Sequence, residues 1–172
     1  MKNKLLIIGA LLAIAGCHNK NYYEVMNTNQ QRFGGWQLDD AQFLNESYDL
    51  ILLVEDMSAL AEKRSTLKET YLLASDASKS VKSLHFNYKT EAMRLRVRLT
   101  SELSKAQDEY FHQLDKISPE NFDAVYARSM KTKLEELGLK MEQYTSTGKS
   151  ERLVELADEV GDTFRSLNES LN

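Results

Sequence analysis

"DDAQFLNESYDLILLVEDMSALAEK", residues Asp39–Lys63, is the stretch that decides the fold. Its two leading acids suit the positive end of a helix dipole. Apolar side chains then recur every three or four positions, which is the period of one helix face; they are Phe43, Leu50, Val54, Met57 and Ala61. The run "LILLV" at Leu50–Val54 is apolar on every side, as in a helix that is covered all round. We therefore expect a central helix in an all-α fold.

The residues that follow predict further helices. A second helix from about Thr66 carries apolar and small residues at alternating 4-3 spacing, the seam of a bundle. The segment Arg94–Leu103 fits a helical stripe poorly and predicts an extended connection, followed by a short helix to about Ile117. "SPEN" at Ser118–Asn121 offers an N-cap serine and a first-turn proline for a fourth helix. A turn at Gly148 then precedes a last helix.

Together these elements predict an up-down four-helix bundle with one short extra helix. Only seven glycines and one proline interrupt the 172 residues, and no β pattern competes with the helical one. The bundle domain is expected to span residues 39–172.

The first sixteen residues predict export. Lys2 and Lys4 precede an uncharged apolar run, Leu5–Ala15. That run is too short to span a bilayer, which needs about 20 apolar residues, and its composition is typical of a secretory signal peptide over residues 1–16. "IAGC" at Ile14–Cys17 resembles the bacterial lipobox. The resemblance implies cleavage between Gly16 and Cys17 and a diacylated, palmitate-bearing Cys17, the only cysteine in the chain. A plain signal peptide and an uncleaved anchor remain as alternatives.

Residues 17–38 are expected to join the lipidated cysteine to the bundle as a flexible tether. The segment is rich in Asn and Gln, lacks a helical or strand period, and ends near Gly34 and Gly35. Fully extended, it would reach roughly 60–70 Å at about 3.3–3.6 Å per residue. We expect Trp36 to pack partly on the bundle.

Composition and motifs argue against several functions. Removing residues 1–16 takes away Lys2 and Lys4, so the formal charge falls from −4 to −6. An acidic chain has little electrostatic attraction to nucleic acid. No Ser/His/Asp set and no Gly-rich phosphate loop is found, so we expect no enzyme and no cofactor.

The metal-binding alternative uses the Glu-x-x-His pair Glu109 and His112, with His85 as a second histidine; a di-iron bundle would need two such pairs and two further carboxylates.

"RLRVRL" at Arg94–Leu99 and nearby Lys89 form the one dense basic patch. It could contact anionic lipid, or be a solvated connection that pairs with nearby acids. The second interpretation is favoured, because most charge runs are solvated faces.

"FDAVYARSM" at Phe122–Met130 resembles a signature of a large family of bacterial lipoproteins. Three further landmarks match in order: "DAQF" at Asp40–Phe43, the pair Leu60–Ala61, and "LDKIS" at Leu114–Ser118. The family is a domain of unknown function, described as predicted outer-membrane proteins with a ferritin-like helical bundle. The resemblance covers about residues 39–172 and implies that fold and location.

The chain departs from the family where a polar centre is expected. Members usually carry a Glu in the first helix and three histidines further on. The matching positions here are Val54, Val81, Leu134 and Leu167. All four lie on the apolar stripes, so we expect them to face the interior. Inward Glu and His side chains are what hold metals in such bundles, so this chain is expected to keep the fold without the metal centre.

The resulting expectation is a lipid-anchored protein of the bacterial cell envelope, in the outer membrane and facing the periplasm, because His18 rather than Asp follows Cys17. Its bundle is expected to act as a non-catalytic binding or structural module, held at the membrane by the anchor and with a possible envelope protein partner. The alternatives are the metal-binding protein above and an envelope stress-sensing lipoprotein that binds a periplasmic helix. An apolar groove between helices would favour the latter.

Overall fold

A computed structural model describes residues 21–169 of the chain. This range contains six helices and no strand: α1 Tyr22–Arg32, α2 Trp36–Arg64, α3 Lys68–Leu95, α4 Lys105–Asp115, α5 Pro119–Thr147 and α6 Glu151–Glu169. The predicted all-α bundle is confirmed. The signal peptide, Cys17 and the proposed cleavage point lie outside the described residues.

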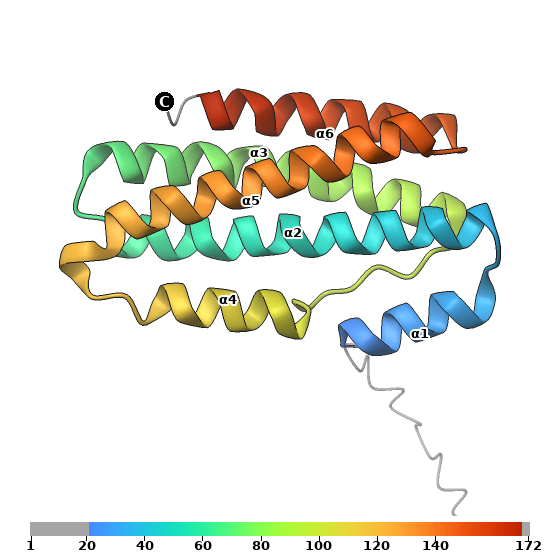
Figure 1. The fold of residues 1–172 in the computed structure, drawn as a ribbon, viewed down its shortest axis with the longest axis horizontal. Helices are drawn as coiled ribbons and strands as arrows, with labels where there is room; N and C mark the ends of the chain where they lie inside the picture. Colours follow the sequence, from blue (N-terminus) through green and yellow to red (C-terminus); the bar gives the residue numbers. More distant parts are fainter. Residues whose placement is uncertain (1–20, 170–172) are drawn as a thin grey trace, which may run out of the picture.

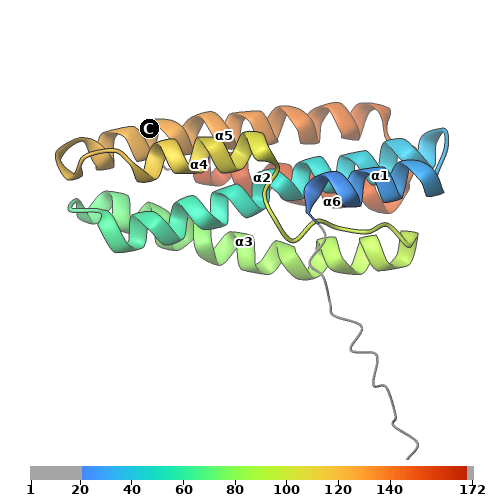
Figure 2. The same cartoon turned by 90° about the horizontal axis from the view of Figure 1, so that it is seen from below.

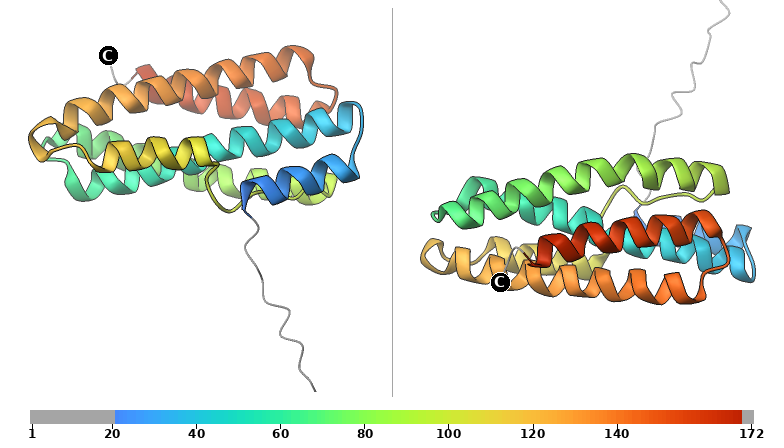
Figure 3. Two further views of the ribbon diagram at one scale, coloured as in Figure 1. Left: turned by 60° about the horizontal axis from the view of Figure 1, so that its bottom comes forward. Right: turned by 90° about the horizontal axis from the view of Figure 1, so that it is seen from above.

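The four long helices α2, α3, α5 and α6 form the bundle (Figure 1). Helix α2 packs against α3 and α5, and α6 closes the arrangement against the same two helices. Helices α3 and α5 therefore form opposite edges (Figures 2 and 3). The short helices α1 and α4 both lie along α2. This arrangement explains why "LILLV" is apolar on all sides, since Leu50, Ile51, Leu53 and Val54 are at most 1% exposed.

One long crossover, residues 96–118, carries the chain back along the bundle after α3 (Figure 1). It consists of the extended segment 96–104, helix α4 and a short turn. Because the crossover returns the chain to the other end, α3 and α5 run in the same direction, while every pair of adjacent long helices is antiparallel (Figure 1). Arg96 starts the crossover in the left-handed region, with φ 58°, and the Val97 amide closes the end of α3 on the Ala92 carbonyl.

Side chains of α2 hold the extended part of the crossover in place. Asn45 is fully buried; it donates to the Arg98 carbonyl at 2.9 Å and accepts from the Thr100 amide at 3.0 Å. One turn later, the Asp49 carboxylate accepts from the Ser104 amide at 2.7 Å. Burial raises the pKa of Asp49. The extended segment has no neighbouring strand. Its buried backbone groups instead form hydrogen bonds with side chains of α2, since buried N–H and C=O groups need a partner.

The flexible tether predicted over residues 17–38 is wrong for residues 22–32, which form helix α1. Asn21 caps this helix by accepting from the Glu24 amide at 3.0 Å, a capping pattern that was readable in "NYYE". Only Val25 and Asn29 of α1 are buried. The Asn29 side chain pairs with both the amide and the carbonyl of Arg98, at 3.1 and 2.9 Å. Helix α1 therefore docks through polar contacts, which a hydropathy period cannot show.

The turn between α1 and α2 depends on glycine. Gly35 has φ 56°, a conformation that side chains disfavour, and it precedes the first residue of α2. Helix α2 therefore begins at Trp36, three residues earlier than the acidic start predicted. Trp36 is 51% exposed, in keeping with its expected partial packing. Gly148, by contrast, has an ordinary φ of −61°; it is close to Tyr144, whose ring leaves no room for a Cβ.

Candidate functional site

The four aliphatic positions Val54, Val81, Leu134 and Leu167 face the interior, as predicted. Val54 and Val81 are fully buried, Leu134 is 2% exposed and Leu167 is 8% exposed, and all four belong to one continuous hydrophobic core. They come from α2, α3, α5 and α6, one from each long helix. The centre of this bundle is therefore filled by aliphatic side chains at the positions where a metal centre would need polar ligands.

His85 lies at the edge of the core between α3 and α2. Its Nδ1 is 2.9 Å from the Tyr48 hydroxyl and its Nε2 is 2.9 Å from a Glu55 carboxylate oxygen. A neutral imidazole satisfies both contacts, accepting from Tyr48 and donating to Glu55. Burial raises the pKa of Tyr48, which keeps its hydroxyl protonated as a donor. This histidine is fully engaged in joining two helices.

Glu109 and His112 lie on the outer side of α4, where their side chains are 63% and 60% exposed. His112 is 3.6 Å from Asp108, and Glu109 is 3.7 Å from Lys105, both within α4. The fold does not bring them to His85, which is held between α2 and α3. Within residues 21–169, no group of three or more His, Cys, Asp or Glu side chains is placed to hold a metal ion.

The landmark residues of the family signature have structural roles. Asp40 of "DAQF" is 2% exposed and accepts from the Tyr144 hydroxyl at 2.5 Å, while Phe43 stacks on the Tyr144 ring with centroids 3.7 Å apart. Burial raises the pKa of Asp40. In "FDAVYARSM", Phe122 is fully buried and Asp123 accepts from the amide and hydroxyl of Thr66, at 3.1 and 2.6 Å.

These two carboxylates fix α5 at opposite ends. Asp123 joins the start of α5 to the α2–α3 turn, and Tyr144 near its end is held by Asp40 of α2. Desolvation raises the pKa of Asp123, but the hydrogen bonds that it accepts, those from Thr66 first, lower it overall. In this chain, Asp40 and Asp123 therefore join helices that are distant in the sequence.

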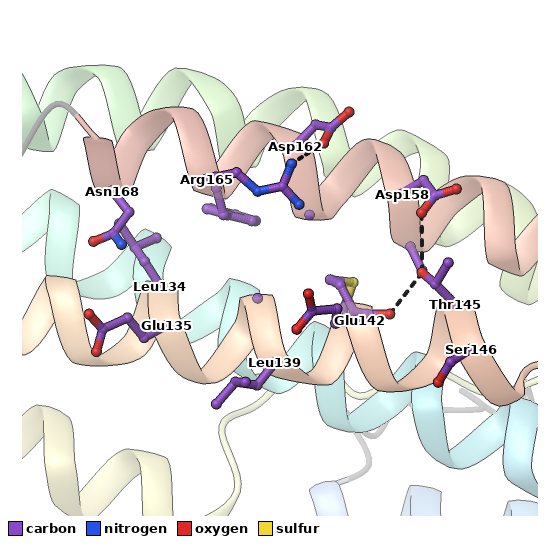
Figure 4. A pocket seen from close by; sticks show the side chains of 15 residues that line it. Leu134, Glu135, Leu139, Glu142, Thr145, Ser146, Asp158, Asp162, Arg165 and Asn168 are labelled. Carbon is purple, nitrogen blue, oxygen red and sulfur yellow. Dashed lines mark hydrogen bonds and ion pairs between the residues drawn. The ribbon is translucent and has the colours of Figure 1, made fainter.

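An open groove runs between α5 and α6 (Figure 4). It has a volume of about 670 Å³. Along α5 it extends from Leu134 to Ser146, twelve residues further on, which corresponds to roughly 18 Å at about 1.5 Å per residue. Seven of its fifteen lining residues are apolar or glycine: Leu134, Gly138, Leu139, Met141, Ala157, Gly161 and Phe164. We call this feature the α5–α6 groove.

The rim of the groove is acidic. Glu135 and Glu142 lie along α5, and Asp158, Asp162 and Arg165 lie along α6 (Figure 4). Arg165 is bound to Asp162 at 2.9 Å, and Asp158 accepts from the Thr145 hydroxyl at 3.2 Å. Four carboxylates against one guanidinium leave a strongly negative edge around an apolar floor, which favours a cationic, amphipathic ligand.

Two glycines keep the groove open. Gly138 and Gly161 lie inside α5 and α6, where glycine costs about 1 kcal/mol relative to alanine. A Cβ at Gly138 would meet nothing within 4 Å, and one at Gly161 would only touch Met141 at 3.5 Å. Packing within the bundle therefore does not require either glycine. Helix periodicity could not reveal the groove, because it depends on which residues of α5 and α6 face each other.

The fold and site define a helical-bundle module with an external groove. Among residues 21–169, no helix is long and apolar enough to cross a membrane. The family described as a domain of unknown function, DUF4142, matches residues 26–171, and the chain belongs to it. The match begins within α1, which agrees with the docking of that helix on the bundle. No curated protein and no solved structure matches the chain.

Proposed function

We propose that this protein is a lipid-anchored module of the bacterial cell envelope, held in the outer membrane and facing the periplasm, whose ferritin-like bundle binds a cationic helical segment of a partner without catalysing a reaction. The observation that carries the proposal is the α5–α6 groove, with its apolar floor and acidic rim. The aliphatic centre at Val54, Val81, Leu134 and Leu167 supports a non-catalytic role that needs no cofactor.

The groove favours a helix as its occupant. Its length of roughly 18 Å matches about three turns of α-helix, and two parallel walls with small residues between them let a third helix approach closely. An amphipathic helix laid in an apolar groove is a recurring mode of peptide recognition. Lysines or arginines beside its apolar face would meet Glu135 and Glu142, neither of which forms an ion pair within residues 21–169.

Charge reversal at the rim tests this proposal. The probe is a fluorescent 14-residue synthetic helix with leucines on one face and lysines beside them, titrated with residues 18–172, which keep the whole core. We expect Glu135→Lys/Glu142→Lys to weaken binding by at least about ten-fold, because like charges across an interface cost several kcal/mol. Fluorescence anisotropy measures the affinity.

The matched control is Glu62→Lys/Glu109→Lys, which makes the same charge change on α2 and α4, away from the groove; it should bind as the parent does. Gly138→Leu should also block binding, because its side chain enters the groove where a Cβ meets nothing. Equal binding of a peptide with glutamates in place of the lysines, or equal loss in the control, would show that the groove is not the site.

The anchor has its own prediction. Cys17→Ser should move the protein from the membrane fraction to the soluble fraction, or stop its processing, because two acyl chains are what make membrane attachment stable. Fractionation of cells, with incorporation of labelled palmitate, measures this. Asn19→Ser, two residues away, is the control and should remain attached. A Cys17→Ser protein that still sediments with membranes and migrates like the parent contradicts the lipobox interpretation.

A further inference from the structure

A row of exposed side chains runs along the outer surface of α3. Lys79, Lys82, Phe86, Lys89 and Met93 follow one another at spacings of 3, 4, 3 and 4, so they share one line on the helix surface. We call this the α3 stripe. All five residues are exposed, so the stripe lies away from the buried face of α3. From Lys79 to Met93 it is roughly 21 Å long at about 1.5 Å per residue.

The apolar members of the stripe are unusually exposed. Phe86 is 73% and Met93 76% exposed, which places both among the most exposed large hydrophobic side chains of residues 21–169. Single exposed apolar residues are normal in proteins. Here two of them lie two turns apart on one line, with Lys89 between them and Lys82 one turn before, which makes the surface amphipathic over its whole length.

The charges around the stripe are uneven. Lys82 and Lys89 form no ion pair within residues 21–169, whereas Lys79 pairs with Asp76 at 3.0 Å. On α2, the Glu55 carboxylate is bound to His85 of α3 at 2.9 Å. The exposed arginines Arg96 and Arg98 continue the positive charge into the crossover.

The flank towards α6 has the opposite sign. There Glu155 and Glu159 share a shallow depression with Phe86, and Asn87 donates to Glu159 at 2.9 Å. Arg152 and Arg94 both bind Glu91, at 3.5 and 2.6 Å. The positive side of the stripe is therefore the side towards α2 and the crossover.

From this arrangement we propose that the α3 stripe docks on the surface of an anionic lipid bilayer, with Phe86 and Met93 entering the headgroup region and Lys82 and Lys89 contacting lipid phosphates. The exposed surface of one helix is narrow, which suits a lipid surface better than a protein partner that needs a broad complementary patch. Lysine stems extend along apolar surface while their charged ends reach headgroups. The inference does not depend on the groove or on lipidation of Cys17.

Co-sedimentation with vesicles tests the proposal on residues 18–172, checked for folding by circular dichroism. We expect binding to vesicles of 30% phosphatidylglycerol and 70% phosphatidylcholine, little binding to phosphatidylcholine alone, and loss of binding in high salt. Lys82→Glu/Lys89→Glu should lower the partition coefficient by roughly ten-fold or more, since each basic residue near such a surface contributes about 1 kcal/mol. Phe86→Ser/Met93→Ser should lower it as well.

The matched control is Lys105→Glu/Lys116→Glu, the same charge change at exposed positions, one at the start of α4 and one just after its end; it should change the partition coefficient by less than about two-fold. An equal loss in the control, or equal binding to both kinds of vesicle, would overturn the proposal. So would a concentration-dependent dimer, seen by analytical ultracentrifugation and abolished by Phe86→Ser/Met93→Ser, without any vesicle binding, because the stripe would then be a contact between two copies of this chain. Because the vesicle assay uses no peptide, its failure leaves the groove proposal standing.

Discussion

Val54→Glu should destabilise the bundle by about 5 kcal/mol at pH 7, enough to unfold a domain of ordinary stability. Val54 is fully buried in α2 within the continuous core. An unfolded glutamate ionises near pH 4.3, while a carboxyl held in hydrocarbon stays protonated above pH 7. Keeping it protonated costs about 1.4 kcal/mol per pH unit above 4.3, and fitting the longer side chain adds about 1–3 kcal/mol.

The sign of the pH dependence separates charge from size. Because the folded-state pKa is raised, the folded protein binds the extra proton, and stability falls as pH rises from about 4 to the raised pKa. Val54→Gln has nearly the same shape and no titration, so its cost should not change over this range. Urea denaturation at pH 5 and pH 7 measures the difference. A Val54→Glu protein with parent-like stability at both pH values would mean that the centre is not closed to water.

Asn45→Asp should detach the extended part of the crossover from α2 and lower the free energy of unfolding by about 3–5 kcal/mol. The substitution only replaces the side-chain NH2 group with an oxygen. The Asn45 amide donates to the carbonyls of Ala41 and Arg98, at 3.0 and 2.9 Å. A carboxylate oxygen in its place would face both carbonyls without a proton, and each unsatisfied buried group costs about 1–3 kcal/mol. Hydrogen exchange should rise in residues 96–104 and in α1, because Asn29 binds the same Arg98 backbone.

Asn27→Asp provides the comparison, because Asn27 is exposed on α1 and its side chain accepts a hydrogen bond from Gln31 in the same helix. It should leave both stability and exchange nearly unchanged. If Asn45→Asp destabilised the protein while residues 96–104 kept their protection, the damage would be local to α2, and the assigned role of Asn45 in holding the crossover would be wrong.

The long helices were predictable because their burial is periodic and apolar. The stripe from Phe43 to Ala61 placed α2, and the proline after Ser118 placed the start of α5 within a residue. The burial of Val54 and Val81 followed from the same stripes. The extended connection after α3 was also predictable, because alternating basic and apolar residues leave no continuous helical face, and Arg96, Val97 and Arg98 are exposed, buried and exposed in turn.

Features that depend on polar contacts between distant segments were not predictable. Helix α1 buries Asn29. In the sequence this residue is typical of a linker, because its partner, the Arg98 backbone, is 69 positions away. The contacts of His85 with Tyr48 and Glu55 join residues 37 and 30 positions apart. The groove depends on Gly138 and Gly161 belonging to neighbouring helices. In each case the residues can be read from the sequence, but which distant residues contact one another cannot.

The docking of α1 determines how this protein would respond to mechanical load. If Cys17 is anchored as proposed, residues 18–20 join the anchor to Asn21, and a pull on that anchor would enter the domain at the first turn of α1. That helix buries one apolar side chain and is held by Asn29 and by Arg32, which binds the Arg96 carbonyl. It would peel away before the four long helices separate, adding roughly 45 Å of contour length over residues 21–33. Helix α1 would thus act as an extensible link that spares the bundle from unfolding under tension.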